Sequence, residues 1–475
     1  MTLPRVQRAG DLVYEIPRSE RADMRVPARI FADADLITQI SRDRSLEQLA
    51  NVATLPGIVE AAFGMPDMHE GYGFPVGGVA GTELPDGVIS PGGIGFDINC
   101  GVRLLVSELT REEVAPKLTE LVHDMSRSIP TGFGRGGRWV LSSSEMDHVL
   151  EEGVPYLARK HRIGTEADLE SIESGGCLEG ASAKHVSERA KARGQDQLGS
   201  LGSGNHFLEV EVVDEVFDAK AAKAFGLEAN RIVVLIHTGS RGLGHQVCSD
   251  HVRIMDQAQS RFGLALPDRQ LAGAPFSSPE GQAYFAAMCA AANFGWCNRQ
   301  TIAHRVRDVF ARFFPKAELR VLYDVAHNTA KVEEISGRKL CVHRKGATRA
   351  FGPSSGEIPA EHRGVGQPVF IPGSMGTASF VLAGTDASRD LALSSCCHGA
   401  GRSLSRSAAK RQVAGHLLRK ELEERGIVVR CPSNSELAEE APKAYKDVER
   451  VVDVVHRVGL AGKVARLRPL GVVKG

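Results

Sequence analysis

The chain has 475 residues, a formal net charge of +0 and a pI of about 7.3. Because positive and negative charges balance, the overall charge does not indicate nucleic-acid binding. A nucleic acid could still bind in a local basic groove. The nine cysteines form no disulfide framework, which is typical of reduced cytosolic thiols. We find no signal peptide and no apolar run of the ~18 residues that a membrane helix needs. We therefore expect a cytoplasmic protein without membrane association.

Short apolar runs among glycines in residues 63–110 predict strands joined by tight loops. Two β-branched runs, 232–236 and 319–323, predict buried strands. Apolar residues at helical spacing predict helices over residues 113–128, 145–162, 181–193, 279–314 with a kink at Gly295, and 404–425.

Strands and helices do not alternate regularly along the chain, which argues against a doubly wound sheet. No linker and no internal repeat divides the sequence, and a hydrophobic fraction of 42% is ample for one large core. We predict a single compact α+β domain over residues 1–475, with mixed sheets flanked by helices and an active site in glycine-rich loops at strand ends. Residues 1–28 are expected to be loosely ordered.

An aspartate and a cysteine lie three residues apart in the glycine-rich run Gly92–Gly101. A thiolate is a poor ligand for magnesium or calcium but suits zinc, iron or, among mixed ligands, manganese. Histidines in similar short runs follow later, two of them at the ends of predicted strands. Since a thiolate can bridge two ions, the set is sufficient for two metals. The predicted ligands are Asp97, Cys100, His206, His237 and His327.

Two further runs have features of a phosphate site. The small residues of Pro372–Ser379 would expose backbone N–H groups and hydroxyls to phosphate, although the run lacks the lysine–serine pair of a P-loop. His398 stands beside mobile glycines and Arg402, where a histidine can act as a nucleophile toward phosphorus.

Five runs taken together resemble the RtcB family of RNA-splicing ligases. They are Gly95–Arg103, Gly202–Phe207, His237–Arg241, His343–Arg349 and His398–Arg402. The resemblance extends over nearly the whole chain, from about Arg29 to Gly475. The departures are a doubled cysteine at Cys396–Cys397 and a phenylalanine at position 96, where tyrosine is frequent. Neither departure removes a proposed ligand.

The resemblance implies a ligase that uses GTP and two Mn²⁺ ions. Its RNA partners would end in a 3′-phosphate or 2′,3′-cyclic phosphate and in a 5′-hydroxyl. His398 would carry GMP covalently and pass it to the RNA, giving an RNA(3′)pp(5′)G end that the 5′-hydroxyl attacks. Transfer-RNA splicing and RNA repair are equally compatible with this chemistry, and the need for an archease-like activator stays open.

The family motifs also imply a nucleotide site. Asn205 and the Ser374 loop would hold phosphates, and Glu209 would accept hydrogen bonds from the N1 and N2 donors of guanine, which adenine lacks. The full set is Asn205, His206, Phe207, Leu208, Glu209, His327, Asn328, Pro372, Gly373, Ser374, Met375, Ser379, His398, Gly399, Ala400, Gly401, Tyr445 and Lys474. Candidates for RNA phosphates are Arg193, Arg241, Arg344, Lys345, Arg349 and Arg402.

Two other functions compete with ligation. The metal ligands alone would also serve a phosphoesterase that opens RNA cyclic phosphates without a nucleotide. An inactive RNA-binding scaffold would be expected if ligands had been lost, and none is missing.

Overall fold

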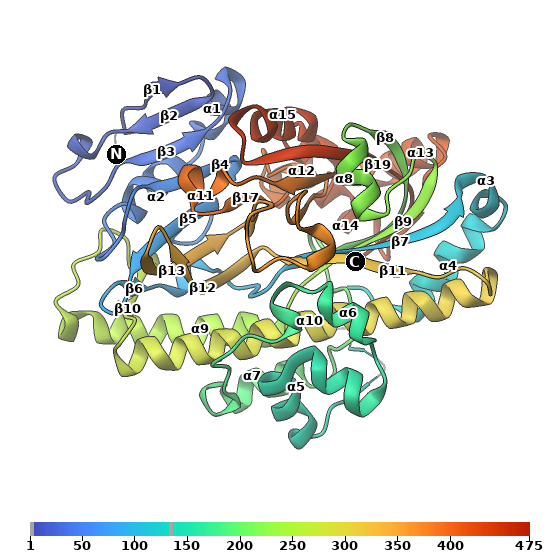
Figure 1. Ribbon diagram of the computed structural model, residues 1–475, viewed down its shortest axis with the longest axis horizontal. Helices are drawn as coiled ribbons and strands as arrows, with labels where there is room; N and C mark the ends of the chain where they lie inside the picture. The colour runs from blue at the N-terminus through green and yellow to red at the C-terminus, as the bar shows by residue number, and fades with distance from the viewer. Residues whose placement is uncertain (1–3, 133–135, 138) are drawn as a thin grey trace.

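Two large sheets and one long helix organise the chain (Figure 1). The computed structural model describes residues 4–132, 136–137 and 139–475. The larger sheet has the order β11-β7-β9-β8-β19-β16-β15, with β18 parallel to β19. Its strands are β7 (Gly101–Thr110), β8 (Phe207–Val216), β9 (Arg231–Thr238), β11 (Arg320–Ala326), β15 (Pro368–Ile371), β16 (Ser379–Gly384), β18 (Val428–Arg430) and β19 (Ala461–Lys474).

The second large sheet has the order β1-β2-β3-β4-β5-β13-β12, with only β3 and β4 parallel. Its strands are β1 (Gln7–Gly10), β2 (Val13–Ile16), β3 (Ala28–Phe31), β4 (Ala62–His69), β5 (Val76–Glu83), β12 (Asn328–Ile335) and β13 (Arg338–Lys345). Two small antiparallel pairs join β6 (Val88–Ile89) to β10 (Ala274–Pro275) and β14 (Ala347–Arg349) to β17 (Ser395–Cys397).

Helices cover the sheets, and α10 and α9 run together along one side of the molecule (Figure 1). The α-helices are α1 (Ala34–Ile40), α2 (Ser45–Val52), α3 (Arg111–Val114), α4 (Leu118–Ser128), α5 (Ser143–Tyr156), α6 (Glu166–Glu170), α7 (Glu188–Gly194), α8 (Ala219–Phe225), α9 (Arg241–Ala258), α10 (Pro279–Phe313), α11 (Ser388–Ala392), α12 (Arg406–Gln412), α13 (Gly415–Glu424), α14 (Asn434–Glu439) and α15 (Val448–Val458). Among the described residues, no helix is both long and apolar enough to cross a bilayer.

The helix α10 is the central support of the fold. Its start is fixed by Ser278, whose side chain accepts a hydrogen bond from the Gly281 N–H, and by a proline at the first helical position. Residues 287–303 of this helix are all buried, because it packs against α5 and α9 as well as β9. A helix that is apolar on most sides is expected in such a position.

The single compact domain of mixed sheets and helices confirms the expected α+β class. The buried strands expected at 232–236 and 319–323 are present within β9 and β11. Residues 7–10 and 13–16, expected to be loosely ordered, form the hairpin β1-β2 at the edge of a sheet. Residues 1–3 lie outside the described part.

Four helix predictions need correction. The helix predicted over 145–162 is interrupted at Gly153, whose φ of 59° is not helical. The helix 279–314 continues through Gly295 without a kink. The region 181–193 is not one helix: Val186 and Ser187 are extended, and α7 begins only after them. The region 404–425 divides into α12 and α13, since Val413 and Ala414 are extended.

A buried ion pair joins α10 to the larger sheet. Arg299 and Asp324 are both fully buried, and Arg299 Nη2 lies 2.7 Å from Asp324 Oδ1. Arg299 Nη1 also donates to the backbone oxygens of Asn99 and Thr238, each at 2.8 Å. On the same carboxylate, Arg103 Nε donates to Asp324 Oδ2 at 2.7 Å. One guanidinium therefore holds three segments of the chain together.

We expect Arg299→Leu to destabilise the protein by about 3–5 kcal/mol, because it leaves the buried Asp324 carboxylate with Arg103 alone and removes the donor to two buried carbonyl groups. Urea unfolding followed by circular dichroism measures the loss. The matched control is Arg312→Leu on the same helix, whose exposed pair with Asp124 is worth about 0–1 kcal/mol. Equal losses in the two variants would contradict the assigned role of Arg299.

Candidate active site

The ends of antiparallel strands bring the predicted metal ligands to one edge of the larger sheet. Cys100 and His206 directly precede β7 and β8, His237 lies near the end of β9, and His327 directly follows β11. Since β9 runs antiparallel to β7 and β8, its end lies beside their starts. Phe207 is accordingly opposite His237 in the sheet. Segments separated by more than two hundred residues thus meet at one place.

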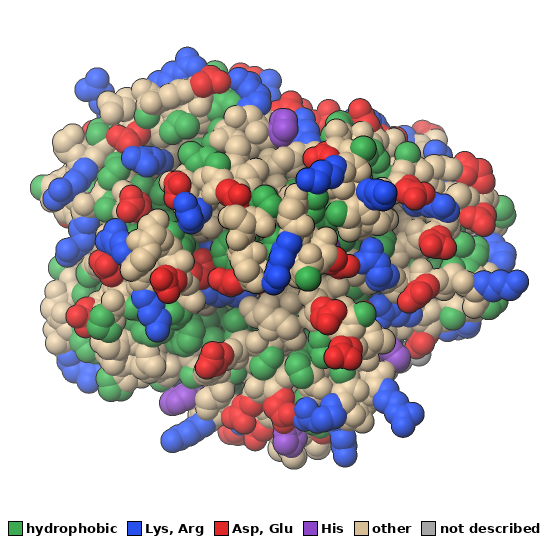
Figure 2. Space-filling model, in the orientation of Figure 1, with side chains coloured by type: hydrophobic (Ala, Val, Ile, Leu, Met, Phe, Trp, Pro, Cys, Tyr) green, Lys and Arg blue, Asp and Glu red, His purple; other side chains and the backbone are tan. Residues whose placement is uncertain are grey.

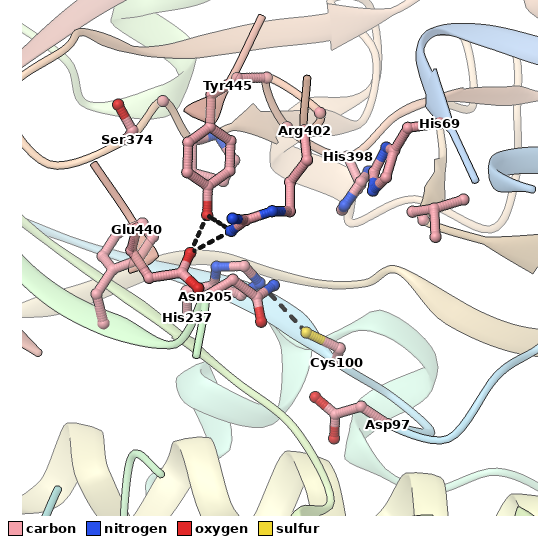
Figure 3. Close-up of a pocket in the computed structure, with 18 of the residues that line it drawn as sticks. His69, Asp97, Cys100, Asn205, His237, Ser374, His398, Arg402, Glu440 and Tyr445 are labelled. Carbon is pink, nitrogen blue, oxygen red and sulfur yellow. Dashed lines mark hydrogen bonds and ion pairs between the residues drawn. The ribbon is translucent and has the colours of Figure 1, made fainter. Parts of the chain in front are cut away.

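Three of these side chains are arranged as a metal-binding group. The ligand atoms of Asp97, Cys100 and His206 all lie within 4.8 Å of one another. Cys100 Sγ lies 3.6 Å from His206 Nε2 and 3.2 Å from His237 Nε2. Figure 3 shows Cys100 between His237 and Asp97.

The orientation of His206 fits a cation. Its Nδ1 lies 2.9 Å from the carbonyl oxygen of Leu201, which can only accept, so this nitrogen carries the hydrogen. In a neutral imidazole Nε2 is then an acceptor, and it faces Asp97 Oδ2 at 2.7 Å. Two acceptors at this separation would repel each other unless a cation lay between them, so His206 Nε2 and Asp97 Oδ2 are arranged as two ligands of one ion. The Leu201 carbonyl oxygen fixes the orientation of the His206 ring, as backbone oxygens do in many metal sites.

His237 and His327 extend this group. The ring centroids of His206, His237, His327 and His398 follow one another at 5.7, 5.5 and 5.3 Å. Both ring nitrogens of His327 and Nδ1 of His237 are buried without a hydrogen-bond partner in the part of the chain that the structure describes. Burial holds the pKa of both residues well below its usual value. Both rings are therefore neutral, as metal ligation requires.

The acidic ligands are also prepared for a cation. Burial opposes ionisation of Asp97, and without a cation it is mainly a protonated His206 that offsets this effect and lowers the pKa of the carboxyl below the usual value. A bound cation would take that role and leave His206 neutral. Burial and the Asp97 charge raise the pKa of the Cys100 thiol well above its usual value. A metal ion would reverse that effect, because a coordinating thiol is deprotonated. The donor set fits a metal that accepts carboxylate, thiolate and imidazole together.

His398 is oriented by a carboxylate from the other sheet. Its Nδ1 lies 2.6 Å from Asp67 Oδ2 in β4, and its backbone N–H donates to the same oxygen at 3.2 Å. Asp67 is fully buried. The arrangement places the hydrogen on Nδ1 and leaves the Nε2 lone pair available as a nucleophile. Next to it, burial and then Lys446 lower the pKa of His69 to about 4.

These groups surround a cavity of about 240 Å³ between the two sheets. It is lined by predicted residues from eight regions of the chain: Asp97, Cys100, Asn205, Phe207, His237, Asn328, Pro372, Gly373, Ser374, Met375, His398, Gly399, Ala400, Gly401, Tyr445 and Lys474. His206, Glu209, His327 and Ser379 are buried in the surrounding structure. The Leu208 side chain instead packs in the hydrophobic core with Val210 and Ile236.

Glu209 and Glu211 share one face of β8, since they are two residues apart in a strand. Both are fully buried or nearly so, and Glu209 Oε1 has no hydrogen-bond partner among the described residues. Burial, and then Glu211, raise the pKa of Glu209 well above its usual value, while Lys474 opposes the shift. An unpartnered acceptor beside the cavity is available to a ligand that donates hydrogen bonds.

Tyr445 closes another side of the cavity. Its hydroxyl donates to Glu440, and the Arg402 guanidinium lies over its ring at 5.0 Å from the centroid. Arg402 Nη1 also donates to Glu440 Oε2 at 2.9 Å (Figure 3). Glu440 is buried and fixes both side chains, so the aromatic ring is held in one position.

The six residues predicted to contact RNA fall into two groups, those buried in the fold and those near the cavity. Arg344 is fully buried in an ion pair with Glu333, and Arg349 is buried between Glu173 and Glu357. The prediction that these two contact RNA is therefore wrong, since their charges are already paired. Lys345 donates to backbone oxygens, including those of Phe74 and Gly92 at 3.2 Å each.

Arg193, Arg241 and Arg402 remain as candidates near the cavity. Arg193 is exposed on α7, and Arg241 lies close enough to Asp97 for their charges to interact. On the face shown in Figure 2, acidic and basic side chains are interspersed, so no large basic surface is evident on that face.

The sequence reasoning missed several residues of the site. Asp67 lies in a histidine-containing run, Met65–Gly73, but its contact with His398 spans the two sheets. Glu440 and Arg299 lie in ordinary helical sequence without a motif. Glu211 could have been found from the sequence, because it is a second acidic residue two positions after Glu209 in an otherwise apolar strand.

We expect the stability of the protein to depend on the proton held by Glu211. Burial raises the pKa of Glu211 from 4.5 to about 7, so the unfolding free energy falls as pH rises through that interval and levels off above it. Glu211→Gln has no proton to lose. Its melting temperature relative to wild type should therefore rise between pH 5 and 7 and stay constant to pH 8 in thermal unfolding. Exposed Glu215→Gln on the same strand should show no such trend, and a flat difference for Glu211→Gln would contradict the assignment.

Comparison with known proteins identifies the family. The family model described as tRNA-splicing ligase RtcB matches residues 48–475. The tRNA-splicing ligases RtcB of Thermococcus kodakarensis and Archaeoglobus fulgidus are 54% and 52% identical over 478 residues, covering 99% of each chain. The RNA-splicing ligase RtcB of Mycobacterium tuberculosis is 55% identical over 435 residues, or 90% of this chain and all of its own. The chain belongs to the RtcB family and is an RNA ligase.

Proposed function

We propose that the protein joins RNA 3′-phosphate or 2′,3′-cyclic phosphate ends to 5′-hydroxyl ends at the expense of GTP, in tRNA splicing or RNA repair in the cytoplasm. The observation that supports this most directly is His398. Its Nδ1 is held by Asp67 at 2.6 Å, and its ring lies 5.3 Å from that of His327 at the end of the metal-ligand row. A nucleophile beside metal ligands is what transfer of a nucleotidyl group requires.

His398 begins the reaction. Its Nε2 attacks the α-phosphorus of GTP, a nitrogen–phosphorus bond forms, and the bond to the departing pyrophosphate breaks. The imidazole gains positive charge as this happens, and Asp67, which accepts the Nδ1 hydrogen, stabilises that charge. The Asp67 carboxylate thus acts on the nucleophile through orientation and charge.

Two further displacements complete the reaction once the RNA carries a 3′-phosphate. Where the RNA has a 2′,3′-cyclic end, water first opens it to that 3′-phosphate. An oxygen of the RNA 3′-phosphate then attacks the phosphorus of the bound GMP and releases His398, giving an RNA(3′)pp(5′)G end. The 5′-hydroxyl of the second RNA attacks the 3′-phosphorus, its proton is lost to solvent, and GMP leaves. An archease-like protein is part of this proposal as an activator of turnover.

Two Mn²⁺ ions are the metals we assign to this site. The residues that would hold them are Asp97, Cys100, His206, His237 and His327. Bound there, the ions would neutralise the charge of the phosphates that these steps bring together.

The guanine base would occupy the part of the cavity near Glu209. In its ionised form the Glu209 carboxylate would accept from N1–H and N2–H, and Lys474, whose Nζ lies over the Phe207 ring at 5.5 Å from the centroid, would favour that form by balancing its charge. Tyr445 provides a fixed aromatic surface for the base. Asn205 and the Ser374 loop lie on the lining of the same cavity and would donate to the phosphates.

Labelled GTP tests the covalent step. With manganese present, we expect an acid-labile protein–GMP adduct that His398→Ala lacks. Asp67→Asn should slow adduct formation by roughly 10²- to 10⁴-fold, because the amide no longer fixes the imidazole tautomer. His123→Ala, an exposed histidine on α4, is the matched control and should form the adduct at the wild-type rate. An adduct in His398→Ala, or none in wild type across divalent metals, would refute the mechanism.

Glu209→Gln tests base recognition. The amide offers one acceptor where the carboxylate offers two, so we expect the rate of adduct formation with GTP, relative to ATP, to fall about 10- to 100-fold. Inosine triphosphate lacks the 2-amino group and should be intermediate with the wild-type protein. Exposed Glu215→Gln serves as the control. An unchanged preference for GTP would assign base recognition to another residue.

A further inference from the structure

Three aromatic rings form a continuous surface outside the metal-ligand row. The ring centroids of Phe96 and His245 are 4.8 Å apart with an interplanar angle of 23°, and those of Tyr72 and Phe96 are 5.0 Å apart. We call Tyr72, Phe96 and His245 the aromatic ledge. His245 is exposed, and the other two are partly exposed. The ledge has no part in the reaction steps described above.

The ledge is continuous with the cavity. Phe96 lines the cavity and directly precedes the metal ligand Asp97. Tyr72 follows β4, which also carries Asp67, and His245 lies in the second turn of α9. Phe96 covers one face of the His245 ring, so the exposed part of that ring is its other face and its edges.

Cations border the ledge on one side. Arg193 Nη1 lies 3.5 Å from His245 Nδ1 and donates to Gln246 Oε1 at 3.0 Å. Arg241 starts the same helix, close to Asp97. Burial and then Arg193 lower the pKa of His245 below its usual value, so the ring is neutral at neutral pH. Aromatic faces beside cations are the combination with which proteins hold single-stranded RNA irrespective of its sequence.

We propose that the aromatic ledge is a subsite for an unpaired terminal nucleobase of an RNA end. The base stacks on His245 in continuation of the Phe96–His245 pair, its phosphate points past Phe96 toward the metal ligands, and Arg193 contacts the adjoining backbone. This inference rests on the proposed function, since it requires RNA ends at the cavity. The chemistry of the ledge fits the last base of the 3′-phosphate strand or the first base of the 5′-hydroxyl strand, and the experiment separates the two.

RNAs with 2-aminopurine at one end or the other test the proposal, because stacking quenches the fluorescence of this base. We expect quenching at one of the two ends on addition of wild-type protein. The double variant Phe96→Leu with His245→Ala should abolish quenching and weaken binding of that RNA by about 5- to 100-fold. The control is His148→Ala. His148 is an exposed histidine stacked on Tyr156 at 5.0 Å in α5, whose residues do not line the cavity.

An abasic nucleotide at the same end completes a thermodynamic cycle of two RNAs and two proteins. Removing the base should weaken binding to the wild-type protein by the same factor as the double variant weakens binding of the intact RNA. The double variant should then bind the abasic RNA no more weakly than it binds the intact RNA. Additive losses, quenching at neither end, or quenching that persists in the double variant would overturn the proposal.

Adduct formation from GTP without RNA separates an effect on RNA from an effect on the metal loop. A fall in ligation that exceeds any fall in adduct formation supports the subsite, whereas parallel falls overturn it. If the wild-type protein quenches 2-aminopurine but forms no adduct, the proposed function fails while the ledge stands.

Discussion

The buried guanidinium of Arg299 is the contact on which the geometry of the site depends. It donates to Asp324, to the backbone oxygen of Thr238 beside His237, and to the backbone oxygen and side chain of Asn99 beside Cys100. An unpaired buried charge is costly, so each of these partners is needed for the others to stay in place. Three metal-ligand segments are thereby positioned by one residue of a rigid helix rather than by their own loops.

The close approach of that helix requires small residues at particular points. A Cβ atom on Gly295 would lie 3.0 Å from the backbone oxygen of Asn99. Asn99 itself has a φ of 51°, in the left-handed region that asparagine tolerates better than most residues. Gly239 serves the same purpose opposite, since a Cβ there would lie 2.5 Å from Asp97 Oδ1. The glycines that mark the ligand loops in the sequence thus reflect how closely helix, strand and carboxylate pack around the site.

Charge is distributed along the site in a simple order. Asp97 and Asp67 stand at the two ends of a row of four imidazoles, the first facing His206 and the second facing His398. The two middle rings, His237 and His327, have no carboxylate partner in the described part of the chain and stay neutral. In the proposed mechanism, the row therefore divides between three candidate metal ligands and the candidate nucleophile, His398, at its end.

The sequence predicts the ligands and the nucleophile better than it predicts the residues that support them. Cys100, His237 and His327 could be placed at strand ends because β-branched runs and glycines are local signals. The contact of Asp67 with His398, or of Arg299 with Asn99, joins segments hundreds of residues apart and leaves no local pattern. Arg344 and Arg349 show the opposite error, because a basic run in the sequence looks the same whether its charges face solvent or are paired inside a sheet.

The position of β19 has a consequence for biosynthesis. This strand lies between β8 and β16 in the interior of the larger sheet, although it is the last strand in sequence. Lys474 at its end lies opposite Phe207, beside the cavity. While a ribosome is still making these residues, β8 and β16 have no partner on their facing edges, and such long-range pairing is slow to form. The nascent protein must therefore keep two unpaired strand edges from aggregating until β19 has been synthesised.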